Sequence, residues 1–199
     1  MTETTSSFLQ YIGRVTMDED IPAWSGYMPE KKLSNDNSRL FFDLPVVARA
    51  LMIADGTVTM ALEVVFKEPI KVNLLDQYML QVDTEVPLLG IDVGSEAFYR
   101  EVELVGEFSG KQYVRAYSLL KRDALSDELW QKLKDREVGM GVVLRNAAQG
   151  SFRKVLHMGI GDLQGNDEDY SHRTYSVNIE NKPAILITEV FSLEALIKN

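Results

Sequence analysis

Two charged residues interrupt strand faces that are otherwise apolar. Glu189 lies in the segment PAILITEVFSL (183–193), where alternate residues share one face of a predicted strand. An ionised carboxylate is costly to bury unless it is paired or hydrogen-bonded. Arg100 interrupts the apolar face of a second predicted strand, AFYREVELVGEF (97–108), in the same way. The sequence therefore predicts one carboxylate and one guanidinium that both point inward.

These two residues allow a structural and a functional interpretation. In the structural one, Arg100 and Glu189 form a buried ion pair with each other. In the functional one, they form opposed polar ends of a pocket, where Arg100 grips a ligand carboxylate as a two-pronged fork. The residues alone favour the structural pair, because such pairs also occur away from functional sites. Arg115, on a face with Tyr113 and Tyr117, is assigned a structural role such as stacking on a ring, rather than lining the same pocket.

Other kinds of chemistry find little support. The chain has no cysteine, which excludes disulfides and thiolate chemistry. Its two histidines, His157 and His172, lie on different predicted strands without a metal-binding spacing, so no metal is expected. No GxSxG motif is present, and GIGDLQG (159–165) lacks the GxGxxG spacing. The segment VGMG (138–141) could present backbone N–H groups to an anion or simply permit a tight turn.

The predicted elements favour an α+β fold with a single antiparallel sheet of about six strands and helices packed on it. Strands are expected at 70–80, 97–108, 112–121, 151–160, 172–180 and 183–193. Two short helices are expected to meet near Ala54–Gly56, and an amphipathic helix is expected over 125–137 with Ser126 as its N-cap. The first 40 residues are predicted to be irregular.

Composition supports one domain over residues 1–199, since 45% of the residues are hydrophobic and 26% are charged. The net charge of -9 argues against nucleic-acid and anionic membrane partners, but not against an anionic small ligand. The N-terminus has no signal-peptide pattern, and no apolar run approaches the length of a membrane helix. We expect a cytoplasmic monomer without membrane insertion.

The order and spacing of several short motifs resemble the chorismate pyruvate-lyase family, from near Leu51 to Leu193. The motifs are LMIADGTVTMALE (51–63), YREVELV (99–105), EVGMGVVL (137–144), SFRKVLHMG (151–159) and RTYSVNIENKPAILITEVF (173–191). The second resembles the family's strand that carries the substrate arginine, which falls on Arg100. The last resembles its terminal hairpin, whose glutamate falls on Glu189.

The resemblance implies an enzyme that converts chorismate into 4-hydroxybenzoate and pyruvate, for ubiquinone precursor supply, without metal or organic cofactor. Arg100 would hold a carboxylate of this small-molecule substrate. Glu189 would hydrogen-bond the hydroxyl end and could take part in proton transfer. Backbone groups at Val58 and Met140 would close the pocket around the substrate or the aromatic acid product. With the resemblance counted, the site interpretation of Arg100 and Glu189 moves ahead of the structural pair.

Two alternatives stay open. One is a non-catalytic binding or sensing domain for a small aromatic acid, as in some bacterial regulators. Such domains are normally tethered to a DNA-binding domain, and this chain has no helix-turn-helix or basic segment. The other is a lyase-fold enzyme that acts on a different aryl-acid substrate. Tyr117 is its main support, because the family often carries an arginine before a threonine on that strand.

Overall fold

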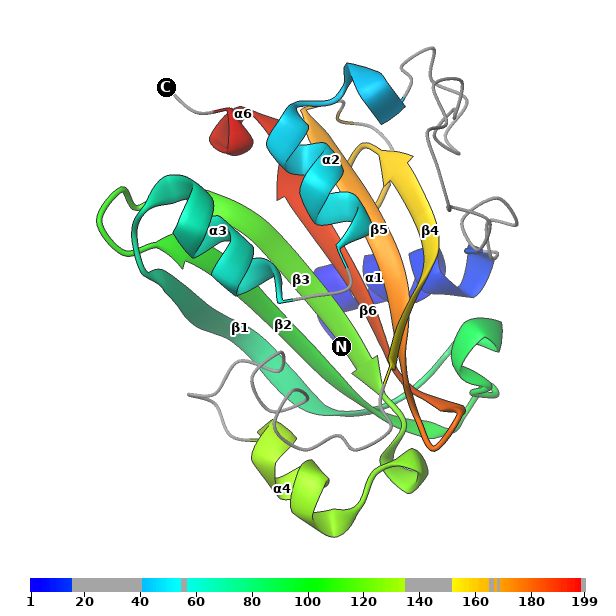
Figure 1. Cartoon of the computed structure of the whole chain (residues 1–199). Coiled ribbons are helices and arrows are strands. Elements are labelled where there is room, and N and C mark those ends of the chain that lie inside the picture. The colour runs from blue at the N-terminus through cyan, green and yellow to red at the C-terminus, as the bar shows by residue number, and fades with distance from the viewer. Residues whose placement is uncertain (16–40, 55–56, 135–151, 165–166, 168, 198–199) are drawn as a thin grey trace.

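The computed structural model describes residues 1–15, 41–54, 57–134, 152–164, 167 and 169–197 (Figure 1). Its sheet contains β1 (Ile70–Gln81), β2 (Glu96–Gly106), β3 (Gln112–Leu120), β4 (Phe152–Ile160), β5 (Tyr170–Ile179) and β6 (Lys182–Ser192). The strands follow the order β1-β2-β3-β6-β5-β4, and every neighbouring pair is antiparallel. The predicted α+β class with one six-stranded antiparallel sheet is confirmed.

Two hairpin-built halves meet in the middle of this sheet, where β3 pairs with β6. The β5–β6 hairpin turns at Glu180 and Asn181, whose φ angles are 51° and 63°. Two consecutive positive φ angles are the geometry that matches the twist of a tight hairpin, and asparagine tolerates it well. The sequence alone suggests a tight turn at Asn181–Lys182 for this hairpin, and the structure places the turn one residue earlier.

One face of the sheet is covered by α2 (Val46–Ile53), α3 (Val58–Phe66) and α4 (Asp127–Lys134). The helices α2 and α3 share a core with β4 and β6, and α4 shares another with β5 and β6 (Figure 1). The Ser126 hydroxyl accepts a hydrogen bond from the Leu129 N–H at 3.2 Å, which confirms the predicted N-cap. The two helices expected to meet near Ala54–Gly56 are also confirmed.

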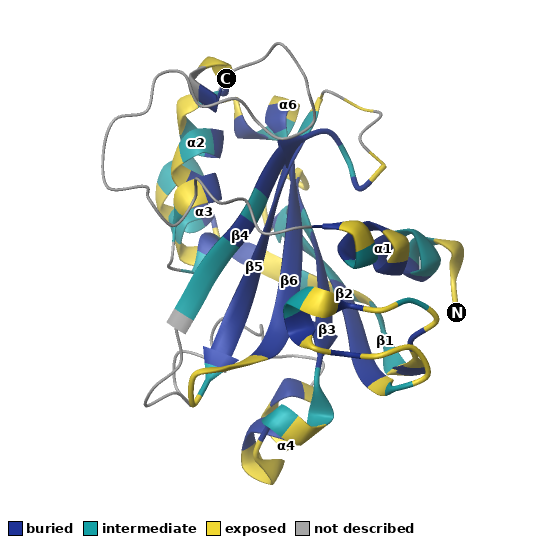
Figure 2. Cartoon of the chain, turned by 90° about the vertical axis from the view of Figure 1, so that its right-hand side faces the viewer, coloured by how far each residue is buried: buried dark blue, intermediate teal, exposed yellow. Residues whose placement is uncertain are grey.

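The opposite face carries α1 (Glu3–Arg14), which corrects the prediction that the first 40 residues are irregular (Figure 2). Thr5, Phe8, Leu9 and Ile12 recur at the spacing of one helical face, and all four are fully buried. The Thr2 side chain caps the helix by accepting from the Thr5 N–H at 3.2 Å. Residues 16–40 lie outside the described part of the chain.

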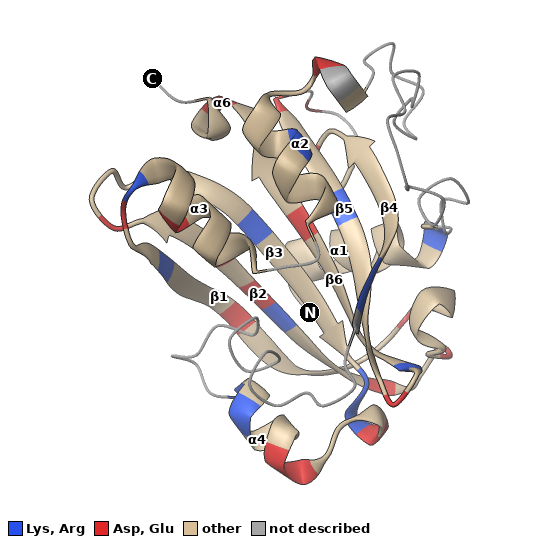
Figure 3. Ribbon diagram, viewed as in Figure 1, with Lys and Arg blue, Asp and Glu red and all other residues tan. Residues whose placement is uncertain are grey.

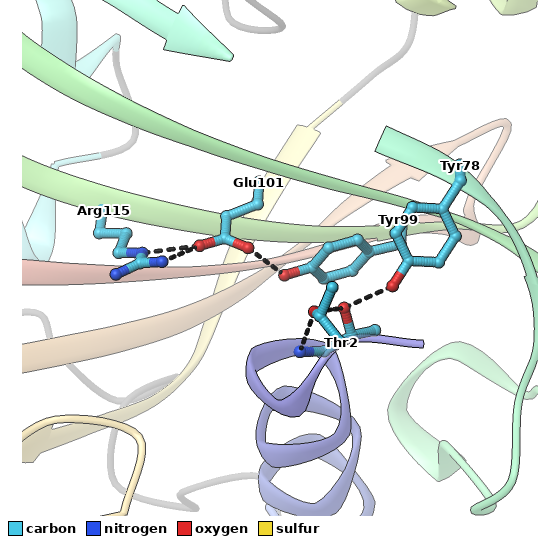
Figure 4. A network of polar contacts seen from close by, with 6 residues as sticks. Thr2, Tyr78, Tyr99, Glu101 and Arg115 are labelled. Atoms are coloured by element: carbon cyan, nitrogen blue, oxygen red, sulfur yellow. Dashed lines mark hydrogen bonds and ion pairs between the residues drawn. The ribbon is translucent and has the colours of Figure 1, made fainter. Parts of the chain in front are cut away.

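A polar network joins α1 to the sheet face beneath it (Figure 4). The Tyr99 hydroxyl donates to Glu101 Oε2 at 2.7 Å, and Arg115 Nε donates to Glu101 Oε1 at 2.7 Å. Thr5 and Tyr78 join their hydroxyls at 2.6 Å. The sequence predicts this face of β2 to be mainly polar, but Tyr99 and Glu101 are buried because α1 covers them.

Short elements complete the described chain: η2 (Phe41–Asp43), η3 (Pro87–Leu89), η4 (Arg122–Ala124) and α6 (Leu193–Leu196). No described helix reaches the length and apolarity that crossing a membrane would require.

Candidate functional site

Arg100 and Glu189 lie on the same face of the sheet, beneath α2, α3 and α4. Arg100 on β2 is aligned with Ser118 on β3, and Glu189 on β6 is aligned with Ala116 on β3. The two residues are therefore two strands apart and offset by two positions, or about 12 Å between Cα atoms from standard strand spacings. Both are buried, at 1% and 6% exposure. Figure 3 shows charged positions along the middle of β2, β5 and β6.

The strand between them carries small side chains at this point. Among the β3 residues on the face of Arg100 and Glu189, Ser118 is aligned with Arg100 and Ala116 with Glu189, and both are buried. The side chains of Ala116 and Ser118 are short. They extend less far from the sheet than the side chains of Arg100 and Glu189. This arrangement suits two polar groups that approach one ring-sized ligand from opposite sides.

Arg173, which the sequence analysis did not select, is the ion-pair partner of Glu189. Arg173 Nε donates to Glu189 Oε2 at 2.7 Å, and the Tyr175 hydroxyl donates to Glu189 Oε1 at 3.2 Å. A direct pair between Arg100 and Glu189 is not among the contacts of the described residues, so that expectation is corrected. The physical reason is strand alignment: Arg173 lies beside Glu189 on the adjacent strand, whereas Arg100 lies two strands away.

Arg173 also fastens the end of α2 to the sheet. Its Nη1 atom donates to the carbonyl oxygens of Met52 at 3.3 Å and Ala54 at 2.6 Å. The last carbonyls of a helix have no partner within the helix, and a cation there is favourable. The guanidinium carbon lies 4.9 Å from the centroid of the Tyr175 ring. In the sequence, Arg173 could have been recognised as the arginine of the Arg-Thr pair that opens the terminal hairpin motif (173–191).

Arg100 plays a similar part at the end of α4. Its Nη1 atom donates to the Leu133 carbonyl at 2.9 Å, and Gln77 Nε2, from the neighbouring position on β1, donates to the Lys134 carbonyl at 3.1 Å. The two arginines thus hold the C-terminal ends of two helices on one sheet face. The polar residues lie between the apolar core beneath α2 and α3 and the core beneath α4.

Val58 is the first residue of α3 and is buried. The Thr57 side chain before it forms no capping hydrogen bond, and the first N–H groups of a helix have no partner within the helix. The contact predicted between the Val58 backbone and a ligand stays a prediction. The position of Val58 four residues after Ala54 brings it close in sequence to the carbonyl that Arg173 holds. Met140 lies outside the described residues, together with the VGMG segment.

Tyr117 and Arg115 lie on the other face of the sheet, away from Arg100 and Glu189. Tyr117 is aligned with Glu101 on β2 and packs its ring 5.4 Å from that of Phe8 on α1. Arg115 pairs with Glu101 and lies 5.7 Å from the Tyr117 ring centroid, in agreement with the structural role predicted for it. The substitution at Tyr117 therefore does not alter the sheet face that carries Arg100 and Glu189.

The two histidines pack together rather than forming a metal site. Their rings stack with centroids 5.6 Å apart, and a ring hydrogen bond joins His172 Nδ1 to the Gly161 carbonyl at 2.9 Å. Burial lowers the pKa of His172, so its imidazole is held in the neutral form. Within the described ranges, no three His, Asp or Glu side chains gather in a way that could hold a metal ion.

Comparison with known proteins identifies the family. The model described as Rv2949c-like chorismate pyruvate-lyase matches residues 52–198. The chain belongs to this family. A chorismate pyruvate-lyase of Mycobacterium leprae is 28% identical over 153 residues, which cover 72% of each chain. A protein of Methanocaldococcus jannaschii that is also named as a lyase is 23% identical over 163 residues, covering 76% of this chain and 81% of its own.

A solved structure supports the fold. The crystal structure of PhnF from Mycobacterium smegmatis superimposes with a TM-score of 0.52 at 14% identity, covering 73% of this chain and 67% of that one. At this identity the likeness concerns the fold alone. The family match covers β1 to β6 and thus every strand that carries a residue of the site.

Proposed function

We propose that this chain is a chorismate pyruvate-lyase that uses Arg100 and Glu189 as the two polar ends of its substrate site. The reaction breaks the bond between the ring carbon and the ether oxygen of the enolpyruvyl group. The ring carbon that bears the hydroxyl loses its hydrogen as a proton, and the ring becomes aromatic. The departing enolpyruvate gains a proton and becomes pyruvate, so chorismate yields one 4-hydroxybenzoate and one pyruvate.

The observation that carries the proposal is the burial of a guanidinium and a carboxylate on one sheet face, two strands apart, with the small side chains of Ala116 and Ser118 on the strand between them. Aromatisation supplies the driving force within the substrate. What the protein has to supply is orientation and stabilisation of the charge that develops on the leaving group. Preorganised groups in a site that excludes water are well suited to both tasks.

Arg100 is assigned to a substrate carboxylate. A guanidinium offers five N–H donors in a planar fork that matches the two oxygens of a carboxylate. One of these donors goes to the Leu133 carbonyl, which fixes the side chain against the end of α4. A charge-assisted, two-pronged bond formed by a side chain already held in place costs little ordering of that side chain.

Glu189 is assigned to the hydroxyl end of the substrate. A carboxylate has about four acceptor positions, and Arg173 and Tyr175 occupy two of them. The remaining capacity suits a hydrogen bond from the substrate hydroxyl. Since Arg173 and Tyr175 both donate to this carboxylate, Glu189 is proposed to act toward the substrate as an acceptor as well, rather than as a donor.

Arg173 is proposed as a positioning residue. Through one guanidinium it connects Glu189 with the Ala54 carbonyl at the end of α2. The chain then continues to Val58, whose backbone N–H is assigned to the ligand. In this proposal, the position of the C-terminal end of α2 and the orientation of Glu189 depend on the same side chain.

The test is incubation of the purified protein with chorismate, with both products quantified by chromatography. The proposal expects equal amounts of 4-hydroxybenzoate and pyruvate. Arg100→Ala and Glu189→Gln are expected to abolish turnover, while Lys132→Met, in an exposed pair with Glu128 on α4, is expected to retain it. Melting curves of each variant establish that the fold is kept.

Two results would contradict the proposal in different ways. If no product forms but 4-hydroxybenzoate raises the melting temperature of the wild type and not of the two variants, the site stands and the lyase assignment fails in favour of a binding domain. If turnover proceeds equally in Arg100→Ala or Glu189→Gln, the chain is a lyase whose site lies elsewhere.

A further inference from the structure

A cavity lies beside α1 (Figure 2), on the face of the sheet opposite to Arg100 and Glu189. Its volume is about 450 Å³, within the size range of small-molecule sites. Its walls come from the first turns of α1, from β3 and β6, and from the connection between β4 and β5. Arg100, Glu189 and Val58 do not line it, because Arg100 and Glu189 lie on the other face of the sheet and Val58 begins the helix α3 that covers that face.

Tyr117 places a hydroxyl without a hydrogen-bond partner at this cavity. The residue is only 6% exposed, and its ring is fixed against Phe8. Within the described part of the chain the hydroxyl makes no hydrogen bond. Its oxygen is not fully enclosed by protein atoms. The hydroxyl therefore reaches the cavity that Tyr117 lines. A buried residue with a free polar group of this kind is suited to receive a ligand.

The charge around this hydroxyl is mainly negative. Glu3, Asp162 and Asp167 line the cavity, and Arg115 is its one cation among the lining residues described. The charge of Arg115 is already balanced by Glu101, to which it donates through both Nε and Nη2. Glu3 also offsets the positive end of the α1 dipole.

The titration behaviour of Tyr117 agrees with that charge balance. Burial raises the pKa of Tyr117 to about 12, and the nearby carboxylates of Glu101, Asp162 and Glu103 act in the same direction, against the opposing effect of Arg115. Three tyrosines, Tyr113, Tyr117 and Tyr170, are among the residues that line the cavity.

We propose that this cavity binds a small organic cation that carries a primary ammonium group on an apolar or aromatic body. The ammonium donates to the Tyr117 hydroxyl and to the Asp162 carboxylate, and the tyrosine rings contact the body. Carboxylates attract the ammonium, and the faces of aromatic rings attract cations and pack against apolar groups. A ligand with a carboxylate in place of the ammonium meets repulsion from the same walls.

The test compares phenethylamine with 3-phenylpropionate by isothermal titration calorimetry on the full chain. The two probes share an aromatic body and differ in the sign of the charged group. Tyr117→Phe removes the hydroxyl and keeps the ring against Phe8, and Asp162→Asn removes one charge. Glu96→Gln, at an exposed position outside the cavity at the start of β2, is the matched control.

Phenethylamine is expected to bind and 3-phenylpropionate is not. Because a hydrogen bond to a charged group is involved, Tyr117→Phe and Asp162→Asn are each expected to weaken binding about tenfold or more, and Glu96→Gln to leave it unchanged. The proposal is overturned if phenethylamine does not bind at millimolar concentration, if 3-phenylpropionate binds equally well, or if both variants bind like the wild type.

Discussion

Replacing Arg173 by methionine tests the buried pair at the centre of the candidate site. Methionine fills much of the volume of the arginine stem but leaves Glu189 with Tyr175 as its one remaining donor among the described contacts. The side chains of the pair are only 1% and 8% exposed. Breaking a buried pair by removing one partner costs about 3–5 kcal/mol. For a chain of this size, that loss lowers the melting temperature by roughly 6–20 °C.

The assay is a double-mutant cycle by urea unfolding, with Arg173→Met, Glu189→Leu and the two combined. The combined variant is expected to recover about 3 kcal/mol relative to the sum of the single losses, because replacing both partners of a buried pair is close to neutral. The remaining loss reflects the carbonyls of Met52 and Ala54, which lose their donor. Lys132→Met, in the exposed pair on α4, is expected to cost under about 1 kcal/mol.

Two results would refute this reasoning. One is a loss under about 1 kcal/mol in Arg173→Met, which would mean that Glu189 finds another partner at little cost. The other is strict additivity of the two single variants, which would mean that the two side chains do not interact energetically.

Three further predictions concern pH and packing. Hydrogen bonds from the Ser109 N–H and hydroxyl lower the pKa of Glu68 from 4.5 to about 2. The stability that Glu68 contributes is therefore present above about pH 4.5 and is lost as the pH falls toward 2. In urea unfolding, Glu68→Gln is expected to reduce this dependence of the free energy of unfolding on pH. Burial lowers the pKa of His172 below 6.5, so the unfolded chain binds the proton first and stability falls as the pH drops through 6.5; His172→Gln weakens this dependence in the same assay. Ala116→Val adds two methyl groups between Arg100 and Glu189, and is expected to weaken 4-hydroxybenzoate binding about tenfold by titration calorimetry while the protein stays folded.

The strands could be predicted from the sequence because each is a short run rich in apolar, β-branched and aromatic residues, with the clearest alternation in 97–108. The helix α1 could also have been predicted, since Phe8, Leu9 and Ile12 follow the helical spacing. Its polar composition conceals this spacing, so the sequence gives no sign that a helix covers the polar face of β2. Once α1 is in place, the burial of Tyr99 and Glu101 follows.

The partner of Glu189 could not be predicted from the residues alone. A two-residue turn at Glu180 and Asn181, continued without interruption, would align Glu189 with His172. An irregularity at Val177 shifts the alignment by one residue and brings Arg173 opposite Glu189. A bulge of this kind leaves a weak signal in the sequence, yet it decides which side chain meets the carboxylate.

Whether Tyr117 lies on the same sheet face as Arg100 and Glu189 could also be established only from the structure. The sequence raised the question of whether Tyr117 changes the chorismate pocket, since it departs from the family there. The alignment of β3 with β2 and the position of α1 answer it, because Ser118 faces Arg100 and Tyr117 packs on Phe8 of α1. The difference from the family pattern at Tyr117 therefore affects the cavity beside α1, which Tyr117 lines.

The most direct test of the central claim is a crystal structure of the protein with bound 4-hydroxybenzoate. We expect the carboxylate of the product at Arg100 and its phenol oxygen at Glu189, with the ring above Ala116 and Ser118. A product bound in the cavity beside α1, or bound without contact to either Arg100 or Glu189, would contradict the assignment.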